Sequence, residues 1–182
     1  VGSAAAANSF KLSATNFSTN FIDGFSSITV GSSSAGNITL AGSVSYRDPL
    51  TLKTAGTIIA DSSVNLTGAA AGVDGIKSSL VLWADADGSG SGSIFLNGTN
   101  SVTTNGGGIW MGGGSGTASW TPYTGASTIT VGNGYAVGDG ITSLAGARYR
   151  SGIEFYGTAV NLTSNGGNIA LYGKSYNAGD KY

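Results

Sequence analysis

A short acidic segment holds the residue types best suited to binding a metal ion. Asp85, Asp87 and Ser89 in "DADGS" place three side-chain oxygens at the first, third and fifth positions of a calcium-binding loop. Such a loop is closed by a bidentate carboxylate at its twelfth position, where this sequence has Leu96. Two interpretations stay open: a weak calcium site, with calcium as the one suggested cofactor, or a corner between strands with solvated aspartates.

The densest group of charges is the second arrangement that bears on chemistry. Arg148, Arg150 and Glu154 lie close together in sequence, with Asp139 upstream. The two arginines share a face if the segment is extended, because side chains alternate along a strand. Carbohydrate cleavage needs paired carboxylates about the glycosidic bond. The group is therefore either an active site or a solvated patch of ion pairs, and we expect a protein that is not an enzyme.

Aromatic side chains form the third candidate group, because they stack on sugars and on protein partners. Trp110 lies between Ile109 and Met111, so it faces outward in a strand whose apolar neighbours face inward. An outward tryptophan indicates a contact with a partner chain, with residues 112–128 folded back, or with a glycan. The predicted interaction surface comprises Trp83, Trp110, Trp120, Tyr123, Phe10, Phe17 and Phe21.

The composition excludes several classes of protein. Charged residues make up 9% of the 182 residues and the net charge is -1, which excludes a basic surface for nucleic acid. The sequence has no His and no Cys, which excludes disulfides, thiolate nucleophiles and Ser-His-Asp triads. No apolar run approaches the ~20 residues of a transmembrane helix. No signal-peptide pattern is visible either, and we expect a processed or excised piece of a secreted chain.

Short apolar-x-apolar triplets supply the elements that must position these residues. The triplets, with their neighbours, form short strands separated by corners rich in Gly, Asn and Ser, which predicts an all-β protein. The chain contains 32 glycines and only 2 prolines, and the corners need residues that tolerate positive φ. The triplets begin at residues 28, 38, 50, 64, 80, 94, 109, 129, 153, 160 and 169.

Two segments of the chain share one plan, which indicates a repeat. "SVTTNGGGIWMGGG" (101–114) and "AVNLTSNGGNIALYG" (159–173) both read strand, Asn-Gly-Gly, strand, Gly. Short self-similar strands with such corners predict a parallel β-helix, or β-solenoid, with Ile109, Met111, Ile169 and Leu171 facing a narrow core. At about 20 residues per coil the chain would make roughly nine coils.

The chain reads as one domain with an appended N-terminal segment. Residues 1–23 are a possible cap or an arm to a second subunit, and residues 24–182 form the β-helix. The strand pattern is interrupted near 112–128 and near 138–152, which we interpret as one or two lateral loop insertions at corners.

Four quoted segments, spread over most of residues 24–173, resemble a known family. "GFSSITVGSSSAGNITLAGSVSYRDPLTLKTAGTI", "LVLWADADGSGSGSIFLNG" and the two self-similar segments above resemble the repetitive regions of filamentous-haemagglutinin-like exoproteins and related bacterial adhesins. The resemblance implies a right-handed parallel β-helix, secretion to the bacterial cell surface, and a role in adhesion or extracellular structure.

Two functions from different classes follow from these observations. The first is a non-enzymatic extracellular structural protein, a β-helix that associates with copies of itself into a filament or sheath or forms the shaft of a surface adhesin. The alternative is a carbohydrate-binding adhesin module, which uses exposed aromatic residues to bind cell-surface glycans.

Overall fold

The structure is a computed structural model of the chain and describes residues 12–60, 63–138 and 151–176. These residues form short β-strands and one five-residue π-helix, η1 (Asn16–Asn20). No helix in these ranges has the length and apolarity to cross a membrane. The strands are β1 (Ile28–Gly31), β2 (Ile38–Leu40), β3 (Val44–Tyr46), β4 (Leu50–Lys53), β5 (Ile58–Ala60), β6 (Asn65–Gly68), β7 (Leu80–Trp83), β8 (Ile94–Thr103), β9 (Ile109–Trp120), β10 (Ile129–Gly134), β11 (Ala136–Val137), β12 (Ile153–Thr163), β13 (Ile169–Leu171) and β14 (Gly173–Lys174).

Parallel pairing of β1, β4, β7, β9 and β13 forms what we name the first ladder. The register places Ile28, Leu50, Leu80, Ile109 and Ile169 one above another. The all-β prediction with parallel strands is therefore confirmed. The expected nine coils are not found in the described residues, where this ladder runs only from β1 to β13. The chain takes a longer path between ladder positions than the sequence pattern indicated, above all between β9 and β13.

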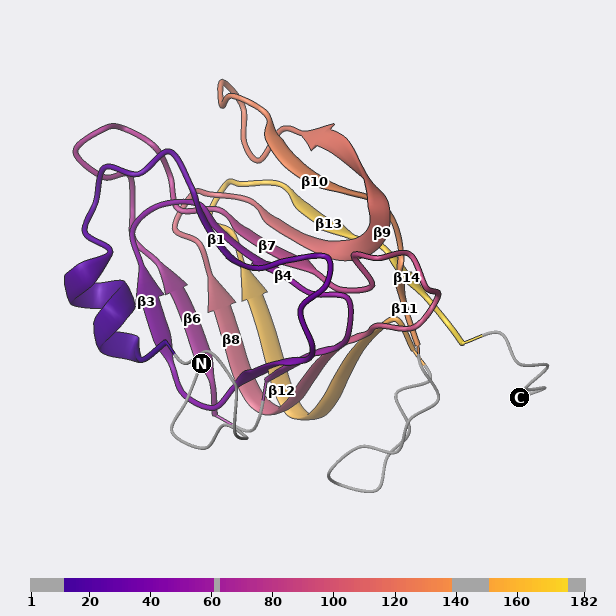
Figure 1. The fold of residues 1–182 in the computed structure, drawn as a ribbon. Coiled ribbons are helices and arrows are strands. Elements are labelled where there is room, and N and C mark those ends of the chain that lie inside the picture. The colour runs from indigo at the N-terminus through magenta and orange to yellow at the C-terminus, as the bar shows by residue number, and fades with distance from the viewer. Residues whose placement is uncertain (1–11, 61–62, 139–150, 177–182) are drawn as a thin grey trace.

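A second sheet faces the first and is built in the same way. Strand β2 pairs in parallel with β5, which pairs with the first half of β8, and β3 pairs with β6, which pairs with its second half. The long strand β12 then lies along the whole of β8. Figure 1 shows β3, β6, β8 and β12 side by side in a sheet that curls at its lower edge.

The main core fills the space between the two sheets. Alternation along each short strand sends every second side chain inward, so Leu80 and Leu82 are 0% exposed, as are Ile109 and Met111. Their partners from the second sheet include Ile94, also fully buried. The triplets of the interior strands β4, β7, β8 and β9 therefore mark core positions, whereas those of β12 and β13 do not become fully buried.

A smaller second core lies on the outer face of the first ladder. Val81, Trp83 and Trp110 point away from the main core and pack with Val131 of β10. Strands β9 and β10 form an antiparallel hairpin that covers this face, with Trp120 paired to Ile129. Because both of its faces are covered, β7 is buried along its whole length.

The hairpin revises the interpretation of residues 112–128. They are a lateral insertion, but residues 112–120 are strand and pair with β10, because the two extended segments satisfy each other's backbone groups, and residues 121–128 form the connecting loop. The second predicted insertion, 138–152, falls mainly on residues 139–150 and lies outside the described residues.

Glycines beside the tryptophans make room for this outer packing. A Cβ at Gly112 would lie 2.6 Å from the Trp110 ring, and one at Gly108 would lie 2.5 Å from the Trp120 ring. The run of glycines around "IWM" therefore reflects indole rings lying against backbone, where any side chain would collide.

The two self-similar segments stack directly on one another. β12 pairs with β8 and β13 with β9, so the second copy of the plan forms the neighbour of the first. The corner residues Asn105 and Asn165 both have left-handed φ values, 49° and 54°. The Asn165 side-chain amide donates to Oδ1 of Asn105 over 3.1 Å, which continues the ladder around the corner.

The ladder offers a matched pair of leucines for measuring core packing. Leu82 and Leu171 occupy the same ladder position, but Leu82 is 0% exposed and Leu171 is 44% exposed. Leu82→Ala should lower the free energy of unfolding by about 2–5 kcal/mol because it leaves a cavity. Leu171→Ala should cost about 1 kcal/mol or less. Urea denaturation of both variants tests this, and equal losses would contradict the described stacking.

Candidate functional site

The last strands of both sheets form an apolar surface that the interior strands do not have. Ile169 and Leu171 of β13 are each 44% exposed, whereas their ladder partners Ile109 and Met111 are 0% exposed. Phe155 of β12 is 43% exposed, whereas its partner Leu96 is 1% exposed. We name Phe155, Ile169 and Leu171, with the free edges of β12 and β13, the terminal face.

The terminal face also carries unpaired backbone groups. Among the described strands β12 pairs only with β8, and β13 only with β9, so one edge of each strand is free. β12 is 11 residues long, and its one charged side chain is Glu154, whose pKa is raised by partial burial. Long edges with few charges are templates for pairing with another strand.

At the opposite end of the stack, the N-terminal segment covers part of the core beside β3. Phe17 of η1 is 1% exposed and packs into the main core beside β3. Its ring meets that of Phe21 edge-on, with centroids 5.5 Å apart. These two residues of the predicted interaction surface are thus core contacts here, and Phe10 lies outside the described residues.

Trp83 and Trp110 are buried, which changes the interpretation of the predicted aromatic surface. They are 3% and 2% exposed, because the β9–β10 hairpin lies over them. The Trp83 indole N–H donates to the carbonyl of Gly114 over 2.9 Å, and the Lys53 ammonium lies 3.7 Å from the ring centroid. A partner could not reach the Trp83 ring without displacing the hairpin, whereas Trp110 borders the pocket described next.

An open pocket lies between the hairpin and β13. Four aromatic residues line it: Trp110, Trp120, Tyr135 and Tyr172. The two tyrosines are 54% and 43% exposed, respectively. Tyr172 packs at 5.9 Å from Trp110 and at 6.4 Å from Tyr135, measured between ring centroids. The sequence prediction missed Tyr135, because it follows the "GNG" interruption and belongs to no alternating pattern.

Tyr123 lies in the turn of the hairpin and contacts the loop before β7. Its hydroxyl accepts a hydrogen bond from the Lys77 amide over 3.3 Å. The Lys77 ammonium lies 4.8 Å from the Tyr123 ring centroid. This tyrosine therefore fastens the hairpin to the body of the protein.

The "DADGS" segment is a tight turn built around one buried carboxylate. Asp85 is 3% exposed, has a φ of 47°, and its Oδ1 accepts from the Ser89 hydroxyl and from the amides of Gly90 and Ser91 at 3.1–3.3 Å. Burial raises the Asp85 pKa, and these donors partly offset it. Asp87 is exposed, and the Ser89 amide lowers its pKa. The calcium interpretation of this turn stays a prediction.

The predicted cluster of charges is represented by one described residue. Glu154 lies on β12 and is partly buried. Asp139, Arg148 and Arg150 lie outside the described residues.

Comparisons with protein families, with curated proteins and with solved structures find no match for this chain. The resemblance to filamentous-haemagglutinin-like exoproteins therefore rests on the sequence segments that suggested it. The terminal face and the aromatic pocket are therefore the two structural features that bear on function.

Asp85 gives a test of the turn. Asp85→Asn keeps an Oδ1 acceptor and tolerates positive φ, so the free energy of unfolding should change by less than about 0.5 kcal/mol. Asp85→Ala removes the acceptor from three donors and should cost about 1–3 kcal/mol. Chemical denaturation measures both changes. A large loss in Asp85→Asn that appears only with calcium present would instead favour the metal interpretation.

Proposed function

We propose that this chain is a non-enzymatic extracellular structural protein, a right-handed β-solenoid that joins copies of itself end to end. The order of the strands supports the solenoid, because the chain passes from the first ladder to the second sheet and back through β1–β3, β4–β6, β7–β8 and β9–β12. Each return makes a parallel pair, and crossovers between parallel strands are right-handed in nearly all proteins.

The observation that carries the proposal is the contrast in exposure along one ladder. Ile109 and Met111 are buried, whereas their ladder partners Ile169 and Leu171 are each 44% exposed. The backbone edge of β13, beside Ile169 and Leu171, is unpaired among the described strands. Another strand laid on this edge would bury the apolar groups and satisfy the backbone groups together. A strand from a second copy is the partner we propose.

The asymmetry of the two ends selects the mode of association. The N-terminal segment packs Phe17 into the core beside β3 at the opposite end, so head-to-tail stacking would meet η1 there. The terminal faces of two copies, related by a two-fold axis, bring the same apolar side chains and the same free edges together. The edges would then pair antiparallel.

A two-fold pair is closed and twice the length of one copy, so it suits the shaft of a surface adhesin, and a filament or sheath would need a further contact between pairs. The absence of Cys and His argues against thiol and Ser-His-Asp chemistry, and the low charge argues against steering of a charged ligand. The sequence resemblance to bacterial exoproteins is the basis for proposing the cell surface as its location.

A charge on the terminal face should block association. Leu171→Lys should stay monomeric by light scattering after gel filtration, from about 10 µM to about 1 mM, where the parent chain should form dimers. Val73→Lys is the matched control, because Val73 is 94% exposed and lies in a loop away from this edge. A monomeric parent chain, or equal association of Leu171→Lys, would disprove end-to-end joining at this surface.

The aromatic pocket favours carbohydrate binding as a second candidate function. Rings of Trp120, Tyr135 and Tyr172 line one open pocket together with the amide side chain of Asn133, which offers stacking surfaces beside a polar group.

A glycan array, followed by calorimetry on any hit, tests this second candidate. Trp120→Ala should abolish the binding, while Tyr176→Ala, which removes an exposed ring away from the pocket, should leave it unchanged. An array without hits, or binding that survives Trp120→Ala, removes this function.

A further inference from the structure

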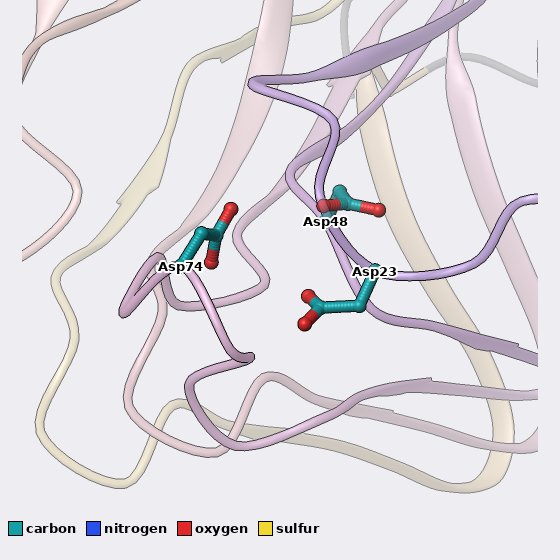
Figure 2. Close-up of side chains that lie close together, drawn as sticks. All are labelled: Asp23, Asp48 and Asp74. Carbon is teal, nitrogen blue, oxygen red and sulfur yellow. The ribbon is translucent and has the colours of Figure 1, made fainter.

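Three aspartates that are far apart in sequence meet at one corner of the stack. Asp23 precedes β1, Asp48 lies between β3 and β4, and Asp74 lies between β6 and β7. One carboxylate oxygen from each lies within 4.8 Å of the other two. Figure 2 shows the three side chains around a common space between their loops, with the Asp23 carboxylate turned towards Asp74.

Two oxygens in this triad are buried without a hydrogen-bond donor. They are Oδ1 of Asp23 and Oδ2 of Asp48, and Asp48 as a whole is 1% exposed. The other oxygen of each carboxylate accepts from a backbone amide of another loop: Asp48 Oδ1 from Gly24 over 3.1 Å, and Asp23 Oδ2 from Val73. A buried carboxylate oxygen with no donor is costly, so each such atom points to an unseen partner.

The negative charge of the three aspartates is also not balanced by a described side chain, which again indicates an unseen partner. No lysine or arginine within residues 12–60, 63–138 and 151–176 forms an ion pair with the triad. Asp48 is buried, and carboxylate oxygens of Asp23 and Asp74 lie within 4.8 Å of one of its own. Like charges held this close repel one another unless a cation lies between them.

We propose that Asp23, Asp48 and Asp74 bind a calcium ion. Two oxygens that each coordinate calcium at about 2.4 Å are at most about 4.8 Å apart, which the triad satisfies. All ligands are hard oxygens on loops, and loops adapt to the irregular shell of calcium better than to the strict octahedron of magnesium. Water would complete the shell on the side of Asp74, the exposed member.

The backbone is fitted closely to this corner. A Cβ at Gly72 would lie 1.9 Å from Oδ1 of Asp23, so only glycine allows the loop of Asp74 to approach. A bound ion would fasten the segment that leads from η1 into β1 to the two loops that follow it in the stack. The site is therefore independent of the terminal face at the other end.

Calcium titration of the full chain after treatment with EDTA tests the proposal. Calorimetry should give one site with a Kd of about 10⁻⁴ to 10⁻³ M or tighter. About 10 mM calcium should raise the Tm by several degrees, and magnesium should do so much less. Asp48→Asn and Asp74→Asn should each weaken calcium binding roughly tenfold or more, and Asp48→Asn should raise the Tm in EDTA because it removes buried repulsion.

Asp87→Asn is the matched control, because it removes one exposed carboxylate from the separate "DADGS" turn. It should bind calcium as the parent chain does. Calcium binding that is lost in Asp87→Asn but kept in Asp74→Asn would place the ion in that turn and overturn the proposal. Absence of heat and of any Tm change in the parent chain, or an equal response to magnesium, would also overturn it.

Discussion

Leu52, Leu82, Met111 and Leu171 lie directly above one another, about 4.8 Å apart as neighbouring parallel strands must be. Each of these side chains stacks on the equivalent residue of a neighbouring strand in the ladder. The core is therefore a column only a few side chains wide, and its stability depends on keeping one register throughout. The exposed terminal face follows from this stacking, because Leu171, the last residue of the column, has a stacked neighbour on one side only.

A narrow column buries little surface for its length, and the protein compensates on its outer face. The β9–β10 hairpin covers Trp83 and Trp110, so the "LVLW" strand packs on two sides where a simple stacked strand packs on one. Glycines at positions 108 and 112 let the indole rings lie flat against the backbone. The high glycine content thus serves outer packing as well as corners.

Local patterns in the sequence predict local structure well here. The alternation in "IWM" places Ile109 and Met111 in the core and Trp110 on the other face, and "NGG" marks corners with left-handed asparagines. The hairpin escaped prediction because "GGGSGTASW" has almost no apolar alternation.

The aspartate triad escaped prediction because its members belong to three separate corners, which meet only once the ladder register is known. Asp23, Asp48 and Asp74 are nonetheless spaced almost evenly along the chain, at an interval close to the average step of the first ladder from Ile28 through Leu50 to Leu80. Even spacing of one residue type at the step of the ladder is the signal that could have found the triad.

The length of chain between successive positions of the first ladder varies widely, from the short step between Ile28 and Leu50 to the long one between Ile109 and Ile169, yet the pairing register never changes. Corners absorb all of this variation, since they lie outside the column of stacked side chains. Evolution can therefore lengthen a corner without disturbing the scaffold, as the hairpin at 109–134 illustrates. For protein engineering, the turn between Trp120 and Ile129 offers a place to graft a foreign peptide on a rigid support.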